Sequence, residues 1–130
     1  MPAALAALVL ASAQAGPAAA WLSRNGMTVR EAGPQRIEVA FRPGRDDPDY
    51  WCAAGDFARS ALRLPGQTRI WRASPKPRGA GEGILFTLDA AQKAEGAGLS
   101  QFGAGPRDGS ISVAMAVGSH CSLEIPLRPD

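Results

Sequence analysis

Alternation of apolar and polar side chains predicts four short β-strands in the first two thirds of the chain. The clearest is residues 36–41, where Ile37, Val39 and Phe41 alternate with polar or small neighbours, as in a strand with one buried face. Gly33 and Pro34 precede this segment and predict a turn, so we expect a hairpin with the strand before them. The other predicted strands are residues 27–31, 68–73 and 84–88.

One segment has the periodicity of a helix with a single buried face. Asp47 is predicted as the N-cap and Pro48 as the first helical residue, with acidic side chains at the positive end of the helix dipole. The helix is expected to end where Pro65 and Gly66 follow Leu64. The predicted apolar face comprises Trp51, Ala54, Phe57, Ala58, Ala61 and Leu62, and Asp56, Arg59 and Ser60 are expected on the opposite face.

The pattern near the C-terminus predicts a second hairpin. Residues 111–117 and 121–127 flank a Gly-Ser pair, and a pair that begins with glycine suits a type II′ turn. In that register Cys121 lies on the face that would pack under the predicted helix, so it can meet Cys52. Between the strand at 84–88 and this hairpin, we expect a short helix at 90–97 and a loop at 98–109.

The N-terminal segment has the pattern of a cleavable signal peptide. No charged side chain occurs from Pro2 to Ala20, and an Ala-rich apolar run fills most of this stretch. Cleavage before Trp21 is preferred over cleavage before Gly16, although both follow a small-x-small site. A buried Ala-rich helix or a retained anchor is the alternative, but a spanning helix needs about 20 apolar residues and this run is shorter.

Composition then bounds the fold. Residues 1–20 are predicted as the signal peptide and residues 21–130 as a single globular domain of ordinary size. The 15 Gly and 11 Pro among 130 residues favour short elements with many turns. We therefore expect an α+β fold: a mainly antiparallel sheet, one principal helix packed on it and a single disulfide. No membrane span is expected once the leader is removed.

Two cysteines in an exported chain predict one disulfide. Paired cysteines persist in the periplasm or outside the cell, and we expect the mature protein in one of these locations. Cys52 and Cys121 would close a loop of about 70 residues, which the chain-entropy account values at roughly 4 kcal/mol. Two separate buried thiols are the alternative. The spacing of the pair matches no CxxC redox or zinc motif.

Charge is distributed unevenly, although the formal net charge is only +2. Between Asp56 and Glu82 every ionisable residue is a cation. One interpretation is a basic surface that binds an anionic partner, and the other is a solvated face balanced in space by the acids at 46–49. The candidate contact residues are Arg59, Arg63, Arg69, Trp71, Arg72, Lys76 and Arg78.

No motif in the chain predicts catalysis, a metal or a cofactor. His120 is the only histidine, and alternation along a strand would point it away from Cys121. The glycine-rich stretch at 79–83 lacks the Gly-Lys-Ser/Thr ending and the following helix of a phosphate loop. The acids at 46–49 lack calcium-loop spacing and are explained by helix capping. An enzyme is therefore less expected than a binding protein, and nucleic acid is disfavoured as a partner after export.

Three segments resemble a group of small exported bacterial proteins that have no assigned activity. They are YWCAAGDFA at 50–58, which contains a Trp-Cys-Ala-Ala-Gly-Asp motif, LPGQTRIWR at 64–72 and GEGILF at 81–86. The resemblance implies export and is consistent with the disulfide. It implies no catalytic or binding residue.

Three functions are compatible with these patterns. The first is a non-catalytic binding protein that contacts an anionic envelope component through residues 59–78. The second is an inhibitor of a periplasmic or external enzyme, presenting a rigid loop at 75–83 or 98–109 to that exported protein. The third is an enzyme with an unrecognised site.

Overall fold

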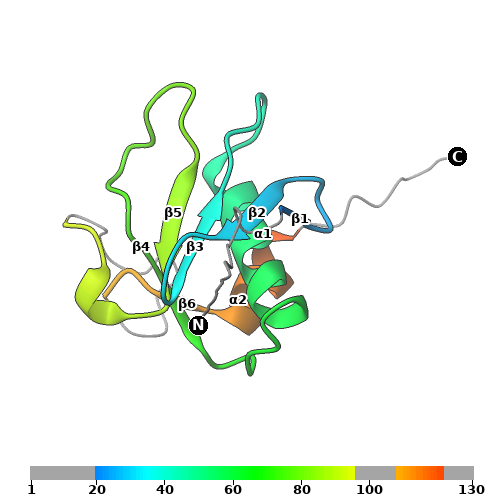
Figure 1. The fold of residues 1–130 in the computed structure, drawn as a ribbon, viewed down its shortest axis with the longest axis vertical. Coiled ribbons are helices and arrows are strands. Elements are labelled where there is room, and N and C mark those ends of the chain that lie inside the picture. The colour runs from blue at the N-terminus through cyan, green and yellow to red at the C-terminus, as the bar shows by residue number, and fades with distance from the viewer. Residues whose placement is uncertain (1–19, 96–107, 122–130) are drawn as a thin grey trace, which may run out of the picture.

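The computed structural model describes residues 20–95 and 108–121, which form the predicted α+β fold (Figure 1). A six-stranded antiparallel sheet carries its two α-helices together on one side. In chain order the described elements are β1 (Trp21–Leu22), β2 (Thr28–Glu31), β3 (Arg36–Val39), α1 (Asp47–Ser60), β4 (Arg69–Arg72), β5 (Ile84–Thr87), the 3₁₀ helix η1 (Ala90–Gln92), β6 (Ile111–Ser112) and α2 (Val113–His120).

The strands lie in the order β1-β2-β3-β5-β4-β6, and each neighbouring pair is antiparallel. The hairpin predicted from residues 27–41 is confirmed as β2 and β3, and Gly33 in its turn has a φ of +118°, which glycine adopts without strain. Val29 lies opposite Val39, and Val39 opposite Ile84, so these side chains form a row on the buried face. The short edge strand β1 was not predicted.

Helix α1 is confirmed, with two corrections to its ends. Asp46, not Asp47, is the N-cap, because the Asp49 carboxylate accepts the Asp46 N–H at 3.1 Å and the helix starts one residue earlier. The helix ends at Ser60 and not at Leu64, so Ala61 follows the last helical residue and is exposed, although the periodicity placed it on the apolar face. Asp56, predicted on the solvated face, is buried because its carboxylate accepts the Arg24 N–H at 2.8 Å.

The predicted C-terminal hairpin is wrong. Residues after Ser112 form α2, and the Ser112 hydroxyl caps it by accepting the Met115 N–H at 3.0 Å. In this helix the apolar residues at 113, 116 and 117 lie on one face and are buried against α1. This burial stabilises a helix more than the alternation of the same segment would stabilise a strand. The second predicted strand, 121–127, lies outside the described residues after Cys121. The helix predicted at 90–97 is reduced to η1, and its last two residues also lie outside the described part of the chain.

The two helices approach most closely at Gly55. A Cβ atom placed on Gly55 would lie 2.6 Å from the Ala116 Cβ and 3.5 Å from the Val113 carbonyl oxygen. Neither atom is the end of a flexible side chain, so the helices could accept a methyl group only by moving apart. The glycine of the Trp-Cys-Ala-Ala-Gly-Asp motif is therefore required by helix packing.

We predict that Gly55→Ala lowers the free energy of unfolding by about 1–2 kcal/mol, because overpacking outweighs the gain in helix propensity. Gly118→Ala on the exposed side of α2 is the matched control, since a methyl group added there would meet no atom within 4 Å. That variant should gain roughly 0.5–1 kcal/mol from propensity alone. Urea denaturation of both variants measures the difference, and equal gains would show that the helices are not in tight contact.

Candidate interaction site

Two neighbouring loops project beyond the same end of the sheet. One joins β3 to α1 and comprises residues 40–46, and the other joins β4 to β5 and comprises residues 73–83. Figure 1 shows them side by side at the top of the molecule, in cyan-green and green. We call them the loop pair. Their length and exposure make them the candidate interaction site, because rigid scaffolds commonly carry binding residues on loops.

A buried arginine fixes the second loop at its start. The Arg72 side chain is only 2% exposed, and its Nη1 lies 3.1 Å from the Asp47 carboxylate at the beginning of α1. Its Nε and Nη2 donate to the carbonyl oxygens of Ser74 and Pro75, at 3.2 and 3.1 Å. Burial lowers the pKa of Arg72, and the Asp47 carboxylate opposes that change. Because guanidinium keeps its proton in proteins, this buried charge requires its partners.

A second arginine joins the two loops to each other. Arg78 donates from Nη1 to the Glu82 carbonyl at 3.1 Å and from Nη2 to the Arg45 carbonyl at 3.3 Å. Its Nε lies 3.7 Å from the Asp47 carboxylate, so one acid serves both guanidinium groups. The Arg78 guanidinium also lies over the Tyr50 ring, 4.8 Å from its centroid, and 5.7 Å from that of Phe41. The loop pair is thus held together at its base.

The outer part of the loop pair presents basic, apolar and proline side chains. Phe41 is 41% exposed, because β3 ends at Val39 and not at Phe41 as the alternation predicted. Arg42 is exposed beside it, and its Nη1 donates to the Gly26 carbonyl at 2.9 Å. On the second loop the exposed residues include Pro75, Lys76 and Pro77. This combination can contact an acidic or an apolar surface.

The seven residues predicted as one basic surface are not brought together. Arg72 and Trp71 are buried. Arg69 is half-buried and donates to the Ser110 hydroxyl and carbonyl, at 3.0 and 3.1 Å. Arg59 and Arg63 are exposed at the far end of α1, roughly 20 Å along the helix from Asp47. Of the seven residues, only Lys76 is exposed in the loop pair, and Arg78 is partly exposed there.

The alternative interpretation of the charge run was a solvated face balanced by nearby acids. The balance is found for Arg72 and Arg78, but Arg72 is buried rather than solvated. Asp47 pairs with both, although the sequence suggested helix capping as its role. Sequence reasoning also missed the loop at 40–46 as part of the site. The sequence held one signal for the role of Asp47. Residues 57–81 contain cations and no acid, so any buried cation among them needs a counterion from elsewhere in the chain. The other loop considered for presentation, 98–109, lies outside the described residues except for its last two positions.

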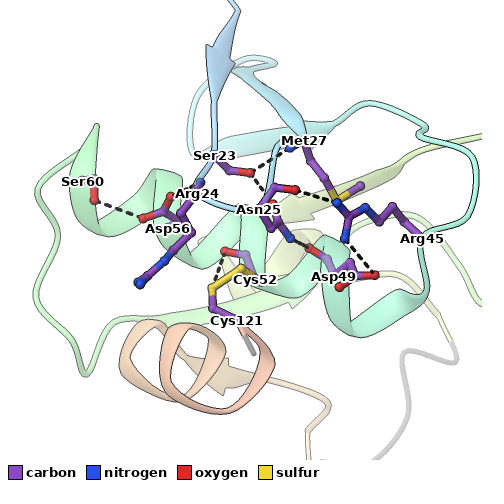
Figure 2. The surroundings of a disulfide bond; sticks show 10 residues. All are labelled: Ser23, Arg24, Asn25, Met27, Arg45, Asp49, Cys52, Asp56, Ser60 and Cys121. Atoms are coloured by element: carbon purple, nitrogen blue, oxygen red, sulfur yellow. Dashed lines mark hydrogen bonds and ion pairs between the residues drawn. A yellow bond between two sulfur atoms is a disulfide. The ribbon is translucent and has the colours of Figure 1, made fainter. Parts of the chain in front are cut away.

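The predicted disulfide is present, and Figure 2 shows its surroundings. Cys52 and Cys121 are joined with an S–S distance of 2.05 Å and a Cα–Cα distance of 4.7 Å. The bond links α1 to Cys121, the residue that follows α2. The predicted link was between the helix and a hairpin. The Cys121 sulfur is therefore not a free nucleophile beside His120.

The turn between β1 and β2 is tied to α1 beside the first loop, as Figure 2 also shows. The Asn25 side-chain amide donates to the Asp49 carbonyl at 2.9 Å, and its backbone carbonyl accepts from Arg45 Nη2 at 2.9 Å. Arg45 also lies 3.8 Å from the Asp49 carboxylate. These contacts fix the end of the first loop next to the start of the helix.

Comparisons with protein-family models, with curated proteins and with solved structures find no match to this chain. In residues 20–95 and 108–121, no three His, Cys, Asp or Glu side chains are grouped so that they could hold a metal ion. Within the same ranges, neither helix has the length and apolar character needed to cross a membrane.

We predict that Arg72→Lys lowers the free energy of unfolding by about 2 kcal/mol or more, because an ammonium cannot reach Asp47 and both loop carbonyls together. Arg30→Lys is the matched control, since Arg30 makes two hydrogen bonds to Glu38 but lies on the exposed sheet face. Its effect should stay below about 1 kcal/mol. Chemical denaturation compares them, and similar small losses would contradict the structural role of Arg72.

Proposed function

We propose that this chain is an exported, non-catalytic binding protein that contacts another exported protein through the loop pair. The observation that carries the proposal is the set of Arg78 contacts, which hold the two loops together at their base while their outer residues stay exposed. Loops that are already ordered lose little conformational freedom on binding, so more of the contact energy appears as affinity. If the partner is an enzyme and the loop pair covers its active site, the same contact would make this protein an inhibitor.

Several features support export. The uncharged Ala-rich leader, the disulfide and the resemblance to small exported bacterial proteins all favour an oxidising compartment. The preferred cleavage site immediately precedes Trp21, which is the first residue of β1. Cleavage there would leave the described sheet complete, including the edge-to-face contact of Trp21 with Phe57, whose ring centroids are 5.3 Å apart.

An extended basic surface for an anionic envelope polymer has less support. Polymer binding uses many exposed cations along one face, and its affinity falls steeply with salt. Here Arg72 is buried, and Arg69 donates a hydrogen bond to Ser110. The exposed Arg59 and Arg63 lie at the far end of α1. The geometry therefore favours a compact contact at the loop pair.

We predict that protein recovered from the cell envelope has an intact mass that begins at Trp21. It should resist alkylation until it is reduced, because both sulfurs lie in the disulfide. Mass spectrometry with and without reduction measures both properties. A mass that begins at Met1, with two thiols alkylated at once, would contradict export.

We predict that Phe41→Ala weakens the complex with the partner roughly 5- to 30-fold, the usual cost of truncating an aromatic anchor. Leu22→Ala is the matched control, because Leu22 is 68% exposed on β1, away from the loop pair. The readout is the fraction of protein that elutes as a complex from native envelope extract. Monomeric elution of the wild type, or equal effects of the two changes, would exclude the proposed contact.

A further inference from the structure

We propose that Lys76 is the anchor of the loop pair and that the partner receives its ammonium group in an acidic pocket. This inference rests on the proposed function and adds the chemistry of the partner. Lys76 is exposed in the second loop. Among the ion pairs of the described residues, none includes it. The acid at the base of the loops, Asp47, is already shared by Arg72 and Arg78.

The chain on both sides of Lys76 is held in place. Before it, Arg72 binds the carbonyl oxygens of Ser74 and Pro75. After it, Arg78 is fixed by the Glu82 and Arg45 carbonyls and by the aromatic rings beneath it. The flanking prolines fix their own φ angles, and a residue that precedes proline has few backbone conformations. The backbone at Lys76 is therefore ordered before any partner binds.

The chemistry of a single exposed lysine on a backbone that is held in place favours a pocket over an extended polyanion. Lysine ends in a compact ammonium with three donors, which suits two or three carboxylate or carbonyl oxygens at the end of a narrow cavity. Phe41 on the neighbouring loop is 41% exposed and lies beside Arg78, two residues from Lys76, so it supplies an apolar contact next to that cavity. A partner of this kind presents an acidic pocket with an apolar rim.

The magnitudes also favour a protein over a bilayer. Each cation near an anionic membrane strengthens binding only about fivefold, so Arg42 and Lys76 together with one phenyl ring give weak attachment. A close charge pair that is desolvated in a protein interface changes affinity tenfold or far more.

The sequence permits a direct chemical test, because lysine occurs only at positions 76 and 93. A zero-length carbodiimide reagent joins a lysine amine to a carboxylate in contact with it, and it would be applied to native envelope extract that contains the full protein. We expect one discrete adduct, in which mass spectrometry maps an amide between Lys76 and an Asp or Glu of a single partner polypeptide. Lys76→Arg should abolish this adduct, since guanidinium does not react.

Affinity is measured separately. Lys76→Met keeps the apolar stem and removes the charge, and it should weaken the complex at least tenfold while leaving thermal unfolding unchanged. Lys93→Met is the matched control and should leave the complex unchanged, because Lys93 is exposed beyond η1. Co-sedimentation with phosphatidylglycerol vesicles tests the bilayer in parallel, and wild-type protein should remain in solution.

Three results would overturn the assignment. They are an adduct confined to Lys93, a complex insensitive to Lys76→Met, and vesicle binding that requires Lys76 in the absence of a protein complex. A complex that depends on Phe41 but not on Lys76 would overturn this inference and leave the proposed function standing. The absence of any complex for the wild type would overturn both.

Discussion

The end of the fold that carries the loop pair depends on one buried guanidinium. Arg72 lies directly opposite Phe86 in the sheet, so its side chain leaves β4 on the face that also carries the core. A charge in that position is tolerated only when its donors are satisfied, and Asp47 with the Ser74 and Pro75 carbonyls satisfies them. The end of a strand, the start of α1 and the path of the second loop are thereby fixed relative to one another.

The position of α2 against α1 is fixed by packing. Gly55 lets α2 approach until only a hydrogen atom fits between the helices, and the disulfide from Cys52 to Cys121 closes the same interface one turn away. The covalent bond restricts the unfolded chain, whereas the glycine contact determines the native distance. Since α1 begins at the loop pair, both contacts also position Asp47, the counterion of the two arginines.

The contrast between the two ends of the sequence shows what a single chain can reveal. The hairpin of β2 and β3 was predictable because turn residues and alternation agree there, and α1 because its cap and periodicity agree. After Ile111 the spacing of apolar residues fits both a strand and a helix, and only the capping hydroxyl of Ser112 with burial against α1 decides between them. The charge run was visible, but its division into buried and exposed cations depends on neighbours distant in sequence.

That division follows the chemistry of the side chains. A planar guanidinium can bind a carboxylate and two carbonyls at once, so arginine suits the buried position 72 and the partly buried position 78, where several acceptors converge. An ammonium holds water strongly and satisfies fewer fixed acceptors, and the only lysine between Asp56 and Glu82 is exposed, as are Arg59 and Arg63 at the other end of α1. The cations of this run therefore differ in role: Arg72 and Arg78 hold the loops through Asp47 and backbone carbonyls, whereas Lys76 is exposed and takes part in none of the ion pairs among the described residues.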